Sequence, residues 1–378
     1  MARRKYGEGS VFPRKDGRYV AQVKLENGKN KQTYHKTEKE AQVALRKMLN
    51  ELEQGTLATG PQQTLKVYLE SWLKDVLKPS SKSVATYESY RIVIEKHIIP
   101  SLGYLRLQQI KPQQVQAFYT RKLKEGLSPK RVRGIHSVLH KALENAVKWN
   151  LISRNVCALV NPPVPKRHEI QTLTQEQAEY LLASAHQHRL EALLTLAVTT
   201  GMRRGELLGL HWQDIDLEKG SLQVRRSVTR MAKHGIVVSE PKTNRSRRKI
   251  LLPAFVIDAL KEHRTRQQEI KDKALDAWRE NGIVFCNIHG DYLAPSILQR
   301  LFKTVLKSAE LPDIRFHDLR HSAATILLGM GVHPKVVQEL LGHSNISMTM
   351  DTYSHVLPSM QEDAMIKMND AFKSSKVN

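Results

Sequence analysis

Cysteine is scarce in this sequence, and so are long apolar runs. The two cysteines among 378 residues, Cys157 and Cys286, lie far apart and fit no disulfide framework or zinc pattern, which is typical of a reducing compartment. The longest apolar run, LEALLTLAV, has about half the length that a membrane-spanning helix needs. The basic start, MARRKYGEGSVF, lacks the apolar segment of a signal peptide. We therefore expect a soluble, cytoplasmic protein without a membrane partner.

Acidic side chains are also in short supply. The chain has 37 of them against 60 lysines and arginines, which gives a formal net charge of +23. A fold does not require this imbalance, so it predicts a polyanionic partner, either nucleic acid or an acidic membrane surface. Residues 61–167 carry 19 basic and 6 acidic side chains, whereas residues 1–60 have a net charge of +6 and residues 168–378 of +4. The middle segment is the strongest candidate for enclosing nucleic acid, and a solvated basic surface is the alternative.

The first 58 residues predict a small three-stranded sheet and one helix. Apolar residues alternate in RYVAQVKL, a hairpin signal at Asn27 and Gly28 follows, and KNKQTYH returns as the next strand. Thr37 and Glu40 have the spacing of a capping box, which begins a helix. The stretch GTLATGPQQ then predicts a linker.

Residues 64–160 predict an all-helical segment, and residues 170–378 a mixed one. The first contains four amphipathic helices, of which we expect the second to end at Pro100. The basic residues of the fourth gather at its N-terminal end, where the helix dipole also favours phosphate. The second segment contains helices and short strands that predict a small antiparallel sheet. The expected fold class is thus a multidomain α+β protein.

The stretch FHDLRHSAATILL places an arginine between two histidines. In a helix, His317, Arg320 and His321 lie on one side. A zinc site on the two histidines would lack the glutamate of the metalloprotease pattern and would hold a cation beside the metal. Satisfied core histidines are a second alternative. An arginine with histidines more often binds a phosphate or a carboxylate.

Three further stretches supply side chains suited to the same chemistry. TTGMRRGELLGL places Arg203 after a glycine break, with Glu206 one turn later. The hairpin EPKTNRSR carries Lys242, and LLGHSNISMTMDTYSHV carries His343 ten residues before Tyr353. With His317 and Arg320, this ordered set resembles the tyrosine recombinase family, also called phage integrases. The first 160 residues are similar to the arm-binding and core-binding domains of mobile-element integrases.

The resemblance implies a site-specific DNA recombinase that works without metal or other cofactor. A tyrosine attacks a DNA phosphodiester and leaves a 3′-phosphotyrosine and a free 5′-hydroxyl, which later reverses the step. The implied nucleophile is Tyr353, the implied general acid is Lys242, and Glu206 is a supporting carboxylate. The groups implied to bind the phosphate are Arg203, Arg320, His317 and His343. Such donors suit the negative charge of the transition state, and a tyrosine with a pKa of about 10 needs a base or cationic surroundings to attack.

Some assignments within the motifs have rivals. Arg204 stands next to Arg203, and Lys249 is a second hairpin lysine, although it falls inside the expected returning strand. His321 is more suited to helix packing than to the phosphate. A tyrosine at position 353 could also be an amphipathic core residue.

The resemblance also implies the domains and partners. Residues 1–58 are expected to bind arm-type DNA sites, residues 64–160 core-type sites, and residues 170–378 to form the catalytic domain. The partners are double-stranded DNA, further copies of the chain in a tetramer on DNA, and accessory DNA-bending or excision-directionality proteins, at the nucleoid of a bacterial host. An apolar stripe in the last residues would dock on a neighbouring protomer or pack on its own domain. The rival functions are a type IB topoisomerase and a non-catalytic DNA-binding protein.

Overall fold

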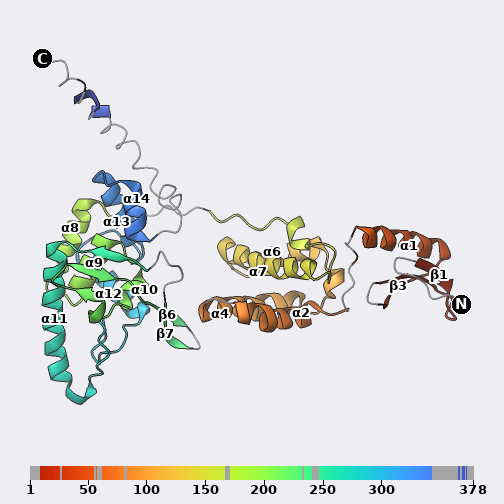
Figure 1. The fold of residues 1–378 in the computed structure, drawn as a ribbon, viewed down its shortest axis with the longest axis horizontal. Coiled ribbons are helices and arrows are strands. Elements are labelled where there is room, and N and C mark those ends of the chain that lie inside the picture. The colour runs from red at the N-terminus through yellow and green to blue at the C-terminus, as the bar shows by residue number, and fades with distance from the viewer. Residues whose placement is uncertain are drawn as a thin grey trace. The chain divides into compact units, whose positions relative to one another are not determined.

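The chain forms two compact units, residues 1–167 and 168–378 (Figure 1). The structure is a computed structural model, and it describes residues 9–25, 28–54, 57, 62–80, 83–166, 171–231, 234–240, 247–342, 365–366, 368–370 and 372.

The N-terminal sheet has the predicted strands. Strands β1 (Gly9–Pro13), β2 (Tyr19–Lys24) and β3 (Asn30–His35) form an antiparallel sheet in the order β1-β2-β3, and helix α1 (Glu38–Glu53) packs on it. Ala21 and Val23 of β2 are fully buried under this helix, because alternate residues of a strand face the same side. Asn27, at the expected hairpin turn, lies outside the described residues.

The start of α1 confirms the expected capping box. The Thr37 hydroxyl accepts a hydrogen bond from the Glu40 N–H at 3.3 Å, and the Glu40 carboxylate accepts one from the Thr37 N–H at the same distance. Two N–H groups that the first helical turn leaves unpaired are satisfied in this way.

The rest of the first unit is helical. Its α-helices are α2 (Leu65–Ser71), α3 (Lys78–Ser80), α4 (Val84–Val93), α5 (Ile99–Leu102), α6 (Pro112–Lys124) and α7 (Pro129–Lys148). Two π-helical turns, η1 (Trp72–Leu77) and η2 (Ile94–Ile98), and two 3₁₀ turns, η3 (Leu107–Gln109) and η4 (Val156–Leu159), connect them. Buried aromatic side chains join α2 and η1 to α7, because the Tyr68 hydroxyl donates to Ala142 O at 2.5 Å and the Trp72 indole N–H to Asn145 Oδ1 at 3.2 Å.

The prediction that the second helix of this segment ends at Pro100 is wrong. Helix α4 continues through η2 into α5 and ends at Leu102. Pro100 stands in the first turn of α5, directly after the π-helical turn. A proline is tolerated in a first turn, because its missing N–H is not needed there.

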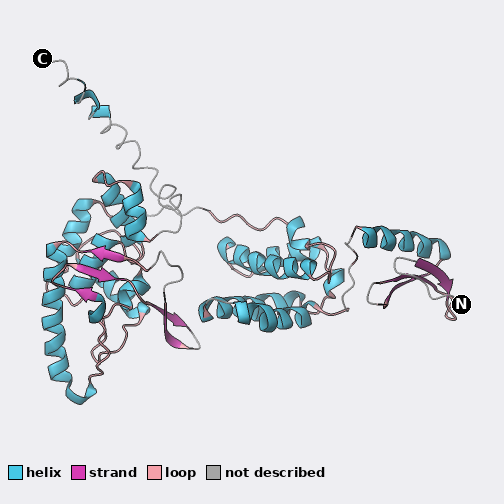
Figure 2. Cartoon of the chain, in the orientation of Figure 1, coloured by secondary structure: helices cyan, strands magenta, loops and turns pink. Residues whose placement is uncertain are grey.

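The second unit has helices around short strands (Figure 2). Its helices are α8 (Gln175–Ser184), α9 (Glu191–Thr200), α10 (Arg204–Leu208), α11 (Ala254–Ala274), α12 (Pro295–Ser308), α13 (Asp318–Gly329) and α14 (Pro334–Leu341), with 3₁₀ turns η5 (Trp212–Asp214) and η7 (Leu275–Ala277). Strands β4 (Ile215–Asp216), β5 (Ser221–Gln223) and β8 (Lys249–Leu251) form one antiparallel sheet, and β6 (Ser227–Met231) pairs with β7 (Gly235–Ser239). The expected α+β fold class is confirmed.

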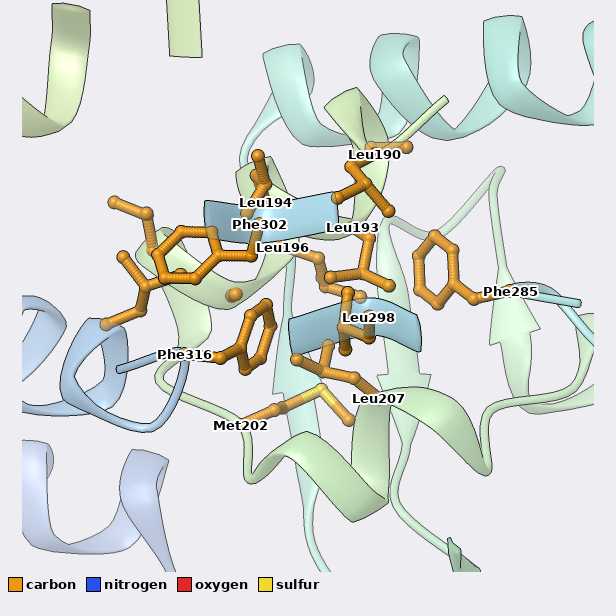
Figure 3. Close-up of a cluster of buried hydrophobic side chains, with 14 of the residues drawn as sticks. Leu190, Leu193, Leu194, Leu196, Met202, Leu207, Phe285, Leu298, Phe302 and Phe316 are labelled. Atoms are coloured by element: carbon orange, nitrogen blue, oxygen red, sulfur yellow. The ribbon is translucent and has the colours of Figure 1, made fainter. Parts of the chain in front are cut away.

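Helix α9 is the centre of this unit. Its sequence, EALLTLAVTT, is buried on nearly every side, and it packs against both α11 and α13. Figure 3 shows Leu193, Leu194 and Leu196 among side chains from other elements, including Phe302 and Phe316. The rings of these two phenylalanines pack edge to face, with 5.3 Å between their centres. Each such buried side chain contributes about 1.5–3 kcal/mol relative to an exposed position, so α9 is held rigidly.

Within the described ranges, no helix combines the length and the apolar character needed to cross a membrane.

Candidate active site

The candidate site begins where α9 ends. Gly201 closes the helix in the left-handed conformation, with φ +58°. The left-handed backbone angle favours glycine, and a Cβ atom there would lie 2.3 Å from the Leu341 Cδ2 atom, so a larger residue would have to displace this buried side chain. The chain turns sharply at this point, and Arg203 precedes the first residue of α10.

A buried carboxylate holds Arg203 in place. The side chain of Glu206 is 3% exposed, and its Oε1 accepts a hydrogen bond from Arg203 Nη1 at 2.7 Å. Its Oε2 accepts from the Arg203 backbone N–H and from Arg248 Nη2, each at 3.0 Å. Burial works to raise the pKa of the Glu206 carboxyl, but the charges and hydrogen bonds of Arg248 and Arg203 outweigh it and lower the pKa below its ordinary value. Glu206 is therefore ionised and orients both arginines.

Backbone carbonyls at helix ends fix the three arginines further. Arg203 Nη2 donates to Gly342 O at 3.0 Å, just after α14. Arg248 Nε donates to Leu340 O at 2.6 Å. Arg320 Nη1, from α13, donates to Gly201 O at 2.7 Å. The ends of α9 and α14 and the start of α13 are thereby joined around one charged cluster.

His317 stands at the N-terminus of α13, beside this cluster. The residue is exposed at the surface, and its ring packs edge to face on the His321 ring with 5.5 Å between the ring centres. Arg320, by contrast, is only 4% exposed. The protein atoms packed around His317 remove part of its hydration, and together with the charges of His321, Arg320 and Arg203 they lower its pKa to about 4. His317 is therefore neutral near pH 7, with one ring nitrogen that can donate a hydrogen bond and one that can accept one.

The structure thus brings together four of the predicted site residues: Arg203, Glu206, His317 and Arg320. The other three, Lys242, His343 and Tyr353, lie outside the described residues. Lys249 is the first residue of strand β8, which agrees with its expected place in the returning strand.

Arg248 is a member of the cluster that sequence reasoning missed. Among the residues before β8 it is a third arginine in RSRRK, and nothing in that pattern separates it from its exposed neighbour Arg247. One signal in the sequence could have found it. Side chains alternate between the two faces of a strand, so Arg248 is expected on the same buried face as Ile250.

In the part of the chain that the structure describes, no three histidine, cysteine or carboxylate side chains gather closely enough to hold a metal ion.

Comparison with known proteins identifies the family. The model of the phage integrase family matches residues 171–360, and the model of the phage integrase N-terminal SAM-like domain matches residues 64–123. A tyrosine recombinase XerC-like protein of Caldanaerobacter subterraneus subsp. tengcongensis is 36% identical over 367 residues, which cover 92% of this chain and 94% of the relative. The chain belongs to the phage integrase family. The resemblance seen in the sequence motifs is confirmed, and this integrase is a tyrosine site-specific recombinase.

Solved structures show the same fold. The Tn1549 transposon integrase, in complex with transposon right end DNA, aligns with a TM-score of 0.66 at 22% identity and covers 81% of this chain and 100% of that one. The lambda integrase tetramer bound to a Holliday junction aligns with a TM-score of 0.56 at 20% identity and covers 89% of this chain and 96% of that one. The expected multidomain fold of an integrase is therefore present over most of the chain.

The lowered pKa of His317 leads to a titration experiment. The imidazole C–H resonance of His317, assigned with a His317→Gln variant, should titrate near pH 4 in the folded integrase, whereas in urea it should return to about 6.5. The unfolded chain then takes up the proton first as the pH falls. His317 therefore does not lower the free energy of unfolding above about pH 6.5, and it lowers this free energy progressively as the pH falls towards 4. If the pKa of His317 in the folded protein equals or exceeds its value in urea, the protein atoms around the ring do not lower its pKa.

Proposed function

We propose that this integrase cuts and rejoins DNA with Tyr353 as the nucleophile, and that it integrates or excises a phage or another mobile element. The observation that carries the proposal is the charged cluster beside His317, which consists of Arg203, Arg248, Arg320 and Glu206. Three arginines and one carboxylate give this cluster an excess of positive charge, which is what a bound phosphodiester requires.

The arrangement suits the transition state of phosphoryl transfer. When the Tyr353 oxygen attacks phosphorus, negative charge increases on the phosphate oxygens, and fixed donors stabilise it most. Arg203 is held by Glu206, yet its side chain remains 37% exposed and accessible to a phosphate. His317 is neutral, so its ring N–H can donate a hydrogen bond to a phosphate oxygen. The positive charge of the cluster favours loss of the phenol proton of Tyr353 to solvent.

The remaining roles follow the family motifs. As the 3′-phosphotyrosine bond forms, the bond to the 5′-oxygen breaks, and Lys242 gives that oxygen its proton. His343 donates a second hydrogen bond to the phosphate. In the reverse step the 5′-hydroxyl of another strand attacks phosphorus and gives its proton to Lys242. The bond from phosphorus to the Tyr353 oxygen breaks, and the phenolate regains a proton from solvent.

We propose three domains with separate tasks: residues 1–58 bind arm-type DNA, residues 64–160 bind core-type DNA, and residues 170–378 carry out catalysis. The core-type assignment is supported by the exposed Lys130, Arg131 and Arg133 at the N-terminal end of α7, where the helix dipole adds to their charge. The Tn1549 integrase, in its complex with transposon right end DNA, has the same fold.

The arm-type assignment is supported by the outward face of the N-terminal sheet. Gln32 and Tyr34 of β3 are exposed there, with Gln32 Nε2 donating to Gln22 Oε1 at 2.5 Å. The guanidinium groups of Arg14 and Arg18 lie over the Tyr34 ring, at 5.3 Å and 5.6 Å from its centre. A polar, basic face of this size fits the major groove of DNA.

We further propose that the integrase acts as a tetramer on DNA, at the nucleoid in the cytoplasm of a bacterial host, with accessory DNA-bending or excision-directionality proteins as further partners. The lambda integrase forms a tetramer on a Holliday junction. Near the C-terminus, large apolar side chains are 51–64% exposed: Met365, Ile366, Met368 and Phe372. Docking on a neighbouring protomer would cover them.

Replacing the nucleophile tests the chemistry. Tyr353→Phe removes only the attacking oxygen, so DNA affinity should stay within about threefold while covalent protein–DNA product disappears. Denaturing gels of a nicked substrate measure that product. Tyr180→Phe, which alters an exposed tyrosine of α8, is the matched control and should form product at the normal rate. Covalent product in the Tyr353→Phe variant would place the nucleophile elsewhere.

Deleting residues 1–61 tests the division of DNA sites. The full chain should protect both crossover and arm sequences in a footprint, whereas the shortened chain should protect only the crossover sequence. Its remaining affinity should fall steeply with salt, because phosphate contacts dominate binding. Identical footprints for the two proteins would refute the arm-binding role.

Truncation after Val356 tests the assembly. Occupancy of a single DNA site should not change, but cooperative occupancy of paired sites should weaken by roughly tenfold, within the usual range of coupling energies. Phe372→Asp should reproduce the effect, and Asp370→Asn, a change of an exposed residue two positions earlier, should not. Unchanged cooperativity would show that the tail packs on its own domain or has no part in assembly.

A further inference from the structure

Arg248 carries a positive charge into the protein. It directly precedes β8 and is 9% exposed. A guanidinium group loses much of its hydration at such a position, and this loss is tolerated only where hydrogen bonds and an opposite charge replace the water. The partners of Arg248 therefore indicate what it is for.

Two of its nitrogens bond to different segments of the chain. Nη2 donates to Glu206 Oε2 at 3.0 Å, and Nε donates to Leu340 O at 2.6 Å. Glu206 holds Arg203, whose Nη2 donates to Gly342 O. The hydrogen bonds thus form a closed ring through Arg248, Glu206, Arg203 and the end of α14.

We propose that Arg248 is a positioning residue for strand cleavage, which fixes the Arg203 guanidinium through Glu206 and fixes the end of α14 against both. The proposal rests on the proposed function, in which Arg203 binds the phosphate. In the sequence, Lys242 stands six residues before Arg248, and His343 directly follows Gly342. The ring therefore joins the chain segments that lead to both of these residues.

The loss of Arg248 would leave Glu206 with a single cation. Its Oε2 would keep only the Arg203 backbone N–H as a donor. The buried negative charge would then draw the Arg203 guanidinium away from its bond to Gly342 O, because a buried carboxylate depends on the charges that compensate it. A shift of about 1 Å in a phosphate-binding group can slow a reaction by about 100-fold. The cleavage step should therefore suffer more than DNA binding.

Glu191 and Arg266 offer a matched control at the other end of α9. Glu191 accepts hydrogen bonds from His186 and the Gln187 N–H, and its Oε2 pairs with Arg266 Nη2 at 2.9 Å. Glu206 likewise accepts from two side chains and one backbone N–H, although both of its side-chain partners are arginines. Arg266→Met thus removes an arginine–glutamate ion pair from the same domain, away from Gly201, although this pair is more exposed than Arg248–Glu206.

The experiment compares Arg248→Met, Arg248→Lys and Arg266→Met in the full chain. At saturating DNA, Arg248→Met should slow covalent-complex formation by about 100-fold, with DNA affinity and the folded fraction close to normal. Arg248→Lys should recover part of the rate, because it keeps the charge but not the planar fork. Arg266→Met should cleave at the normal rate. An Arg248→Met rate within threefold of normal, or a loss that only follows the folded fraction, would overturn the proposal.

A second measurement does not depend on cleavage. The Arg203 side-chain N–H resonance of the DNA-free integrase, assigned with Arg203→Lys, should shift in Arg248→Met and stay unchanged in Arg266→Met. No shift in Arg248→Met would overturn the positioning role. A wild-type chain that forms no covalent complex with its own attachment-site DNA would instead refute the proposed function, and this resonance would still decide whether Arg248 holds Arg203.

Discussion

The Glu206 carboxylate is almost completely buried, and an isolated charge at such a position costs several kcal/mol. Two guanidinium groups and one backbone N–H offset this cost, and each of them comes from a defined place in the fold. The donors can reach the carboxylate only if α10, the residues before β8 and the end of α14 are correctly packed. The geometry of the candidate site and the packing of the catalytic unit therefore depend on each other.

The hydrophobic core supplies the rigidity that this arrangement needs. Helix α9 has almost no polar face, so it stays fixed between α11 and α13. Its end is equally constrained, because Gly201 meets Leu341 with no room for a Cβ atom and accepts a hydrogen bond from Arg320. The position of Arg203 follows from these contacts rather than from its own side chain.

Local patterns in the sequence predicted local structure well. The alternation in RYVAQVKL and the spacing of Thr37 and Glu40 gave the N-terminal sheet and the start of α1, because both depend on residues close together in the chain. The ordered motifs led to the family, which the comparisons confirm. Pro100 was misjudged, because the effect of a proline depends on the helical turn that precedes it.

The role of Arg248 was beyond such patterns. Its bonds join residues that are 42 and 92 positions apart, and no periodicity describes contacts of that kind. The spacing of Arg203 and Glu206 was visible because the two residues share one helical turn. The spacing gave no information on what would satisfy the second oxygen of the carboxylate.

The charge excess of the cluster has a consequence for folding. Arg203 and Arg248 share one carboxylate, and Arg320 is bonded to the Gly201 carbonyl two residues before Arg203. Like charges at close range repel, so part of the free energy released by core packing is spent on keeping them there. Natural proteins often trade stability for activity in this way. The catalytic unit is therefore expected to gain stability when an anion occupies the cluster, and inorganic phosphate or sulfate would act as a stabilising ligand in purification and storage.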